Sequence, residues 1–393
     1  MSKQNLSGNR KRLTFSLTLF LVMIAAVACV NDLTPEGGWS GPVEEGGYLF
    51  IGNHDGSLVR FNPESGNLDS NWRYPDGDGL GAMYSKSVII GENIYNVGYT
   101  CSGDNCRAEV FGLNLADGSP IWGQNGLELN TKLVGSIGVS GETIFIGTTG
   151  IGEEEDGADG YFYAIDSATD ASSIVKWRIA LDSNSFSGVV VDGSTAYIGT
   201  MEGTLYAIDI SNIDDSANSE DRIKWTFHAE GAIAGPIHAE NGNLYFGDLA
   251  SNVYKLNASS RSGSSQISEV NSSNGEWIFD VGVWVWAAPI IENGVVYVSA
   301  LDGSIFALDE ATGSENWSSS IEGQIVSSPT LFDRQRGDTR ERALAVPSGK
   351  ENVWVISVID GRELGVFVTG GPVKATPLVY NENLYVHTMS GDI

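Results

Sequence analysis

The sequence repeats a unit of about 49 residues, and six copies of this unit end in a tryptophan. The clearest copy runs from Ala288 to Trp317 and contains four short apolar strands separated by glycine turns. One such antiparallel meander cannot bury both of its faces, so the copies must stack around an axis and share a core. The repeat therefore predicts an all-β fold, a β-propeller of seven or eight four-stranded antiparallel blades. The tryptophans that we expect to pack between neighbouring blades are Trp72, Trp122, Trp177, Trp225, Trp277 and Trp317.

The number of blades depends on the C-terminal part of the sequence. A seventh copy contains Val353–Ile356 and Phe367, and we expect this phenylalanine to replace the closing tryptophan. An eighth copy begins at about residue 372 and stops at Ser390–Ile393, where its third strand should start. Residues 30–38 are too few to supply the two missing strands. Either seven blades close the ring and leave a spare hairpin, or an eight-bladed propeller has an incomplete last repeat. We favour a chain of eight blades that has been cut short, because a free strand edge inside the ring would favour aggregation.

The N-terminal 28 residues have the pattern of an export signal. Four basic residues and no acidic one precede the apolar run Leu13–Ala28, which is short for a membrane-spanning helix. The run ends in Ala-Val-Ala-Cys, which resembles a bacterial lipobox and predicts that Cys29 is lipidated as the first residue of the mature chain. An ordinary secretory signal and a retained anchor are the alternatives. We expect a lipoprotein signal peptide at residues 1–28, a short tether at 29–38 and the propeller at 39–393.

The charge of the chain limits its partners. Lys and Arg number 22 against 50 Asp and Glu, which gives a formal net charge of -28. This composition excludes sequence-independent nucleic-acid binding, which needs clustered Lys and Arg. A surface of this kind repels anionic lipid and attracts cations or basic partners. We therefore expect contact with a membrane only through the Cys29 lipid, although adaptation to a salty medium is the simpler explanation of the charge.

The two remaining cysteines, Cys101 and Cys106, flank the turn-forming tetrapeptide Ser-Gly-Asp-Asn. Outside the cytoplasm they could close a small disulfide loop across a hairpin. A zinc site would need two more ligands, and no histidine lies near them in the sequence. We interpret the pair as a local disulfide that stabilises the fold modestly.

The segment Ala307–Trp317 resembles the tryptophan-docking motif of the pyrroloquinoline-quinone (PQQ)-like propeller repeats, apart from Ser314, where lysine is usual. Gly112–Trp122 is a looser copy with the same spacing. The resemblance covers about residues 39–393 and is specific for the fold, because the motif positions stabilise blades. It implies either a quinoprotein dehydrogenase, with PQQ and Ca²⁺ as cofactors, or a cofactor-free propeller lipoprotein.

The lipoprotein branch fits the sequence better. The chain has no pair of adjacent cysteines and no haem-attachment C-x-x-C-H, and no aspartate can be nominated as a catalytic base. Enzyme activity stays uncertain and is the less favoured hypothesis. The branch includes BamB-type outer-membrane assembly lipoproteins, which act as scaffolds. The resemblance implies a lipid-anchored scaffold that binds other envelope proteins through blade-edge loops. Val30 after Cys29 implies the periplasmic face of the outer membrane in a Gram-negative envelope, and another envelope type implies the outer face of the cell membrane.

Three local features have both a functional and a simpler interpretation. Trp284 and Trp286 stand where a first strand begins, so they could form a channel or partner platform, or one ring could pack between blades. The polar insertion Ser259–Asn274 is typical of a flexible connector, although such loops also bind partners. A cluster of carboxylates could bind Ca²⁺ weakly, but a solvated acidic loop is favoured, since the spacing of calcium loops is absent. Its residues are Glu153, Glu154, Glu155, Asp156 and Asp159.

Overall fold

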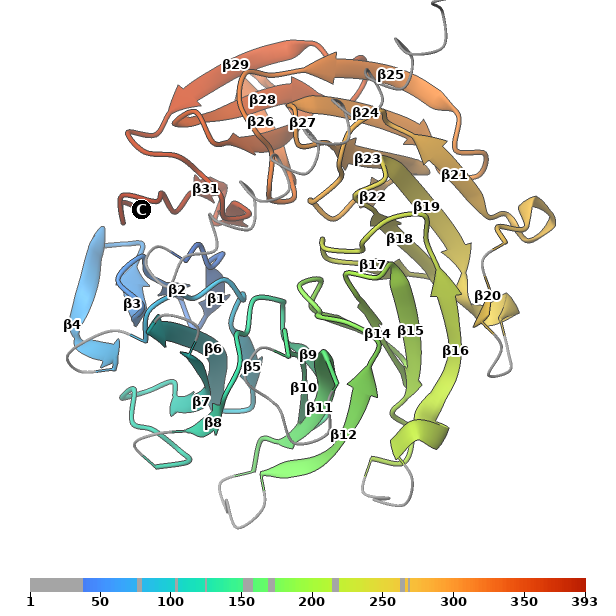
Figure 1. Ribbon diagram of the computed structural model, residues 1–393. Helices are drawn as coiled ribbons and strands as arrows, with labels where there is room; N and C mark the ends of the chain where they lie inside the picture. The colour runs from blue at the N-terminus through green and yellow to red at the C-terminus, as the bar shows by residue number, and fades with distance from the viewer. Residues whose placement is uncertain are drawn as a thin grey trace, which may run out of the picture.

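The computed structural model describes residues 38–75, 80–102, 105–123, 126–150, 158–168, 174–213, 219–261, 266–267 and 269–393. These residues form a ring of β-sheets around a central axis (Figure 1). The only helices among them are three single-turn 3-10 helices, η1 (Ser219–Arg222), η2 (Ala258–Ser260) and η3 (Ser272–Asn274). No helix in this part of the chain is long and apolar enough to cross a bilayer. The predicted signal peptide and Cys29 lie outside the described residues.

Seven of the sheets are antiparallel blades of four strands in sequence order, and β20 adds a fifth strand to blade 4. Blade 1 consists of β1 (Val43–Glu45), β2 (Tyr48–Gly52), β3 (Leu58–Asn62) and β4 (Asn67–Tyr74). Blade 2 consists of β5 (Val88–Ile90), β6 (Asn93–Ser102), β7 (Asn105–Asn114) and β8 (Leu127–Leu129). Blade 3 consists of β9 (Gly138–Ser140), β10 (Thr143–Gly147), β11 (Gly160–Asp166) and β12 (Val175–Leu181). Blades 4 and 5 consist of β13 (Val189–Asp192), β14 (Thr195–Gly199), β15 (Thr204–Asp209), β16 (Ile223–His228) and β20 (Gln266–Ile267); and β17 (His238–Glu240), β18 (Asn243–Gly247), β19 (Asn252–Asn257) and β21 (Trp277–Asp280). Blades 6 and 7 consist of β22 (Ile290–Glu292), β23 (Val295–Ser299), β24 (Ser304–Asp309) and β25 (Glu315–Ser320); and β26 (Thr330–Arg336), β27 (Thr339–Ser348), β28 (Asn352–Ser357) and β29 (Glu363–Val368).

Five tryptophans, which lie on a fourth strand or, in blade 2, shortly before it, join a blade to the next one. The indole N–H donates to a backbone carbonyl in the turn between the third and fourth strands of the following blade. The donor and acceptor pairs are Trp72 with Leu115 (3.1 Å), Trp122 with Ala168 (2.9 Å), Trp177 with Ile213 (2.9 Å), Trp277 with Glu310 (2.9 Å) and Trp317 with Val358 (3.1 Å). Trp225 instead lies beside the guanidinium of Arg261, 5.9 Å from the ring centroid. Each of the five donating indoles thus both packs and has a hydrogen-bond partner.

A glycine in the receiving turn makes this docking possible. Gly313 has a φ of +70°, and a Cβ atom there would lie 2.6 Å from the Trp277 ring. A Cβ atom at Gly118 would likewise contact the Trp72 ring, and one at Gly361 would contact the Trp317 ring. Glycine is required at such a position both by the left-handed backbone and by the flat contact of the indole. The short motif that repeats through the sequence therefore encodes the joint between blades.

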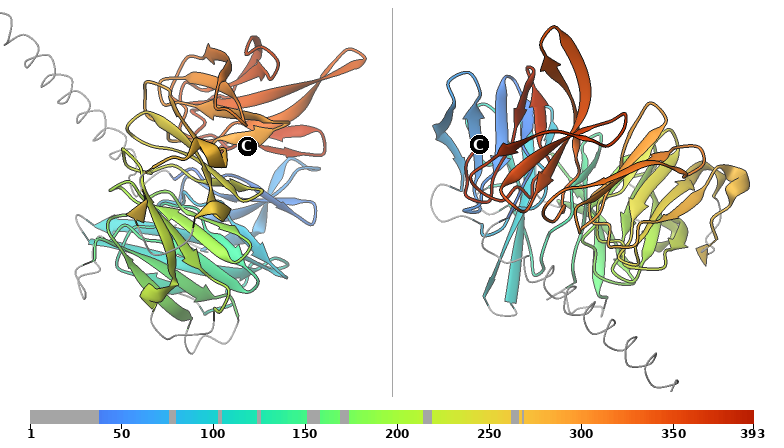
Figure 2. Two further views of the ribbon diagram at one scale, coloured as in Figure 1. Left: turned by 90° about the vertical axis from the view of Figure 1, so that its right-hand side faces the viewer. Right: turned by 90° about the horizontal axis from the view of Figure 1, so that it is seen from above.

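An eighth sheet of two strands, β30 (Leu378–Tyr380) and β31 (Asn383–Tyr385), stands between blade 7 and blade 1. Leu378 packs with the buried core of blade 1, and Leu384 packs with that of blade 7. In Figure 1 the label of β31 and the C-terminus lie between blade 7 and blade 1. The views in Figure 2 also place the C-terminus beside blade 1. The prediction of a propeller with an incomplete eighth repeat is confirmed.

The prediction that Phe367 replaces the closing tryptophan of blade 7 is wrong. In blade 6, Trp317 pairs with the residue just before the bulge of the third strand, Ala307. The equivalent residue before the bulge of blade 7 is Val355, and it pairs with Gly365. Phe367 lies two residues further along the same face. Blade 7 therefore has no aromatic side chain at the docking position.

The described residues of the polar insertion Ser259–Asn274, which are 259–261, 266–267 and 269–274, are more ordered than those of a flexible connector. Its strand β20 pairs in parallel with β16 of blade 4. Arg261 donates to both carboxylate oxygens of Glu276, at 3.1 and 2.7 Å, and these two side chains are almost fully buried. The same carboxylate accepts from the backbone N–H groups of Asn257 and Asn271. A buried charge pair with this many hydrogen bonds fixes the base of the insertion to blade 5.

Candidate functional site

The innermost side chains of the ring come from the loops that lead into the eight first strands. One residue stands three or four positions before each of these strands, and all eight residues line one axial cavity of about 280 Å³. In blade order they are Trp39, Tyr84, Val134, Phe186, Ala234, Trp286, Val326 and Lys374. The incomplete eighth sheet therefore contributes its share of the cavity wall. Because first strands begin where second strands end, this cavity opens on the same face of the ring as the turns between second and third strands.

Aromatic rings and one amine form the part of the wall around the first blade. Trp39 and Tyr84 meet edge to face, with their ring centroids 4.4 Å apart. The ammonium group of Lys374 lies over the Trp39 ring, 4.7 Å from its centroid. A cation over an indole face is attracted by the negative charge density of the ring. This contact connects the eighth sheet to blade 1 at the side of their joint that faces the axis.

Lys86 brings a second amine to the cavity. Its side chain is reached by solvent, but the surrounding walls disfavour its charged form, and this desolvation lowers the pKa of Lys86. Among the described residues that line the cavity, none has a carboxylate side chain. Two amines and several aromatic rings suit an anionic or aromatic group of a ligand.

The Ca²⁺ of a quinoprotein dehydrogenase does not fit this cavity. Calcium takes six to eight oxygen ligands and prefers carboxylates. The lining offers hydroxyl groups, such as those of Ser136, Ser328 and Thr376, together with two amines that repel a divalent cation. The donor set of the cavity therefore supports no calcium-dependent chemistry there.

The structure separates the two tryptophans of the Trp284–Trp286 pair. Trp286 belongs to the cavity wall, whereas Trp284 is half-buried and not among the lining residues. The Trp284 carbonyl accepts from the N–H of Leu301 (2.9 Å), which ties the entry of blade 6 to its next turn. One indole of the pair thus faces the axis, and the two do not form a joint platform in the cavity.

The acidic loop is described only at its end. Asp159 is exposed, and Glu153, Glu154, Glu155 and Asp156 lie outside the described residues. Within the described ranges, no three His, Cys, Asp or Glu side chains come together as a metal site would require.

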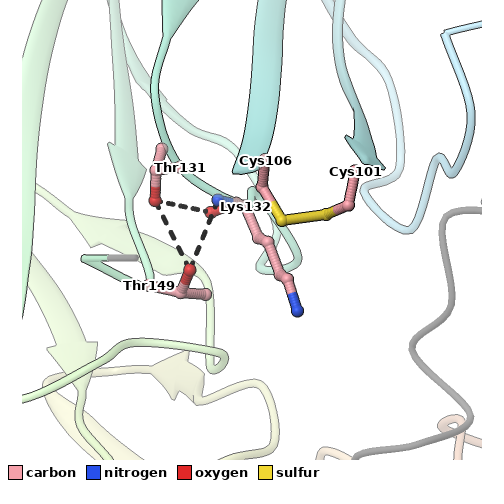
Figure 3. Close-up of a disulfide and its surroundings, with 5 residues drawn as sticks. All are labelled: Cys101, Cys106, Thr131, Lys132 and Thr149. Carbon is pink, nitrogen blue, oxygen red and sulfur yellow. Dashed lines mark hydrogen bonds between the residues drawn. A yellow bond between two sulfur atoms is a disulfide. The ribbon is translucent and has the colours of Figure 1, made fainter. Parts of the chain in front are cut away.

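Cys101 and Cys106 form a disulfide near the tip of the long β6–β7 hairpin of blade 2. Figure 3 shows this disulfide together with Thr131, Lys132 and Thr149 of the neighbouring chain segments. The Lys132 N–H donates to the Thr149 hydroxyl (3.3 Å), and Thr149 and Thr131 hydroxyls lie 3.4 Å apart. The hairpin tip points to the same face of the ring as the cavity mouth, because it is a turn between a second and a third strand.

Sequence reasoning did not find most of this cavity. Trp39, Tyr84, Lys86 and Lys374 were not singled out, and only Trp286 was. The residues differ in size, charge and polarity, so they form no motif. Their common signal is their place relative to each first strand, which can be read once the repeats are aligned.

Comparison with known proteins assigns the chain to a family. The family model described as outer membrane protein assembly factor BamB matches residues 29–262 and 213–391. The chain belongs to the BamB family. Its structure is similar to the crystal structure of BamB from Moraxella catarrhalis, with a TM-score of 0.61 and 16% identity over 90% of this chain and 92% of that chain. It is also similar to the computationally designed Ika8 protein, with a TM-score of 0.60 and 14% identity over 91% of this chain and 96% of that chain. None of the curated proteins compared with the chain matches it. At these identities the two structures show a shared fold.

Proposed function

We propose that this chain is a protein-binding scaffold of the cell envelope that takes part in outer-membrane protein assembly. The observation that carries the proposal is the match of the BamB family model to nearly all residues from 29 to 391. The family is named for an assembly factor, and binding surfaces are what such a role requires of a propeller. The proposed scaffold needs no cofactor.

The cavity face of the ring is the proposed binding face. It gathers the aromatic mouth of the axial cavity, the turns between second and third strands and the disulfide-closed β6–β7 hairpin. Indole docking fixes the blades against one another, so these turns are held in place before a partner arrives, and little entropy is lost on binding. The high net negative charge of the chain favours partners with basic surfaces.

Photo-crosslinking within one blade tests the face directly. A photoreactive amino acid replaces Asp302, which is exposed in a turn of the cavity face, or Asn293, which is exposed in a turn of the opposite face. Crosslinking in the native envelope should capture a specific protein from position 302 and not from position 293. Recovery of the components of a β-barrel assembly complex would identify the role. Equal labelling from both positions, or none from either, would refute the proposed binding face.

We further propose that a lipid on Cys29 anchors the chain to the periplasmic face of the outer membrane in a Gram-negative envelope. The Ala26–Cys29 sequence supports the anchor, and the name of the family supports the location. Cys29→Ser should move the chain from the membrane fraction to the soluble fraction, while Cys101→Ser should not. Continued membrane association of the Cys29→Ser chain would contradict the anchor.

The alternative function is a dehydrogenase that holds PQQ with Ca²⁺ in the axial cavity. The absence of carboxylates from the cavity lining makes it the weaker proposal. Adding PQQ and Ca²⁺ should leave the melting temperature unchanged and give no dye-coupled oxidation of alcohols or aldoses. A raised melting temperature together with such oxidation would replace the scaffold proposal by this one.

A further inference from the structure

The wall of the axial cavity consists of two layers of side chains. The eight residues that stand before the first strands form a mouth layer. Most of the loops supply a second lining residue two positions later, as Tyr84 and Lys86 do in blade 2 and Val134 and Ser136 do in blade 3. Because each first strand leads away from the mouth, these second residues lie deeper and form a floor layer. A ligand in the cavity therefore meets two different environments.

The mouth layer is mostly apolar and aromatic. Blade 4 contributes Phe186 to it and blade 6 contributes Trp286, and both rings are half-buried. In a ring of seven blades and an eighth sheet, blade 4 stands opposite the eighth sheet and blade 6 stands opposite blade 2 (Figure 1). Phe186 and Trp286 therefore stand across the axis from Lys374 and Tyr84. Neither ring stacks on another aromatic side chain of the described chain, so each can stack on a planar group of a ligand.

The floor layer is polar and includes one amine. Its residues with polar side chains are Lys86, Ser136, Ser328 and Thr376. Hydroxyl groups can donate hydrogen bonds to an anion, and hydrogen bonds from an ammonium group are stronger because they are charge-assisted. The described residues of the lining carry no carboxylate, so an anion at the floor meets no side chain of like charge there.

Lys86 takes part in no ion pair with a carboxylate of the described chain, although acidic residues outnumber basic ones by 50 to 22 in the sequence. The cavity walls disfavour its charged form and so lower its pKa. An anion beside this amine would favour the charged form again. Lys86 is therefore placed to bind an anionic group rather than to hold the fold together.

The volume of the cavity limits the size of the ligand. It is about 280 Å³, at the lower end of the roughly 300–1,000 Å³ that is usual for ligand pockets. A molecule with one or two rings fits this space. The two layers also fix its orientation, since an acidic group belongs at the polar floor and a ring belongs at the aromatic mouth.

We propose that the axial cavity binds a small aromatic carboxylic acid as its anion. The carboxylate accepts hydrogen bonds from the Lys86 ammonium group and from hydroxyl groups of the floor layer. The ring lies between Phe186 and Trp286 in the mouth layer. The Lys374 ammonium group, which lies over the Trp39 ring, adds positive potential at the mouth. This binding site goes beyond the proposed scaffold function and does not rest on it, because it requires only the lining of the cavity.

The probe for this site is 2-naphthoate, which has two fused rings and a single carboxylate. The full chain is titrated by calorimetry in the presence of a chelator, so that Ca²⁺ plays no part. It should bind one equivalent with a Kd of about 0.1 mM, as expected for a ligand of this size. The neutral 2-naphthamide should bind about tenfold more weakly, because it cannot form the charge-assisted hydrogen bonds. Decahydro-2-naphthoate, which keeps the carboxylate but has no aromatic ring, should bind about fivefold more weakly.

Variants of the two layers locate the binding. Lys86→Met removes the charge from a side chain that solvent reaches, and should weaken 2-naphthoate binding by about tenfold. Its control is Lys350→Met, which makes the same change of charge at an exposed turn of the cavity face outside the lining and should change binding by less than about twofold. Trp286→Leu should weaken 2-naphthoate binding by about fivefold, whereas Trp284→Leu, outside the lining, should change it by less than about twofold.

Several results would overturn the inference. They are absence of 2-naphthoate binding up to about 1 mM, equal binding of 2-naphthamide, and equal effects of Lys86→Met and Lys350→Met. Equal effects of Trp286→Leu and Trp284→Leu would also contradict the position of the ring at the mouth. The comparison of the three ligands uses the unaltered chain, so it holds even where a variant fails to fold. Capture of a partner from position 302 is measured without the acid, and the two proposals therefore fail separately.

Discussion

His387 stands two residues after the end of β31 and is 3% exposed. The equivalent residues of complete blades are small, for example Gly199 and Ser299. The pKa of His387 is lowered to about 4, mainly because burial disfavours the charged imidazole; a backbone contact at Ser40 raises the pKa, and the nearby His54 lowers it. Replacement by serine, as at Ser299, should remove the pH dependence that this buried ring gives to the eighth sheet.

The sign and size of the effect follow from linkage. An unfolded histidine has a pKa near 6.5, so between pH 6.5 and 4 the unfolded chain binds a proton that folded His387 does not. The stabilisation is fully present above pH 6.5 and is lost as the pH falls toward 4. At about 1.4 kcal/mol per pKa unit, the loss at pH 5.0 relative to pH 7.5 is about 2 kcal/mol.

Urea unfolding of the wild-type chain and of His387→Ser at pH 7.5 and 5.0 measures this loss. The wild-type chain should lose about 2 kcal/mol more free energy of unfolding between the two pH values than the variant does. His228→Gln, which removes an exposed imidazole, should behave as the wild type. Equal losses in the wild-type chain and His387→Ser would refute the reasoning, as would an imidazole pKa near 6.5 in an NMR titration of His387.

Two further changes test the joints and the insertion. Gly313→Ala places a methyl group against the docked indole and in a left-handed backbone, and should cost about 3 kcal/mol in urea unfolding. Gly294→Ala, with a φ of +76° and open space, should cost about 1 kcal/mol, and equal costs would contradict the docking argument. Glu276→Gln leaves buried Arg261 without its carboxylate and should cost about 3 kcal/mol, while Glu382→Gln in an exposed ion pair should cost less than about 1 kcal/mol. A thermal melt that does not separate these two variants would show that the buried pair does not fix the insertion.

The fold could be predicted because its joints are encoded locally. A turn glycine and a tryptophan four residues later recur in the sequence, as at Gly313 and Trp317. The glycine receives the indole of the preceding blade, and the tryptophan docks on the following blade. The same spacing, counted from Gly361, reaches Gly365 and not Phe367. The assignment of Phe367 failed because residue type was given more weight than spacing.

The axial cavity could not be predicted in the same way. Its wall takes two or three residues from each of eight loops, such as Val134–Ser136 and Lys374–Thr376, and these loops lie far apart in the sequence. Side chains at the axis need only fit the space that the other loops leave there. A residue as small as Ala234 and one as large as Trp286 therefore occupy equivalent positions. The parallel pairing of β20 was missed for a related reason, since two residues carry no readable periodicity.

Among the described residues, blade 7 presents no indole to the eighth sheet, unlike the five blades whose tryptophans donate to a turn of the next blade. A ring opens most easily at its weakest joint, because the other joints resist separation. The cation–π contact between Lys374 and Trp39 links the eighth sheet to blade 1 at the wall of the axial cavity. Lys374 also lines the axial cavity, so a shift of the eighth sheet relative to blade 1 would change the wall of that cavity as well.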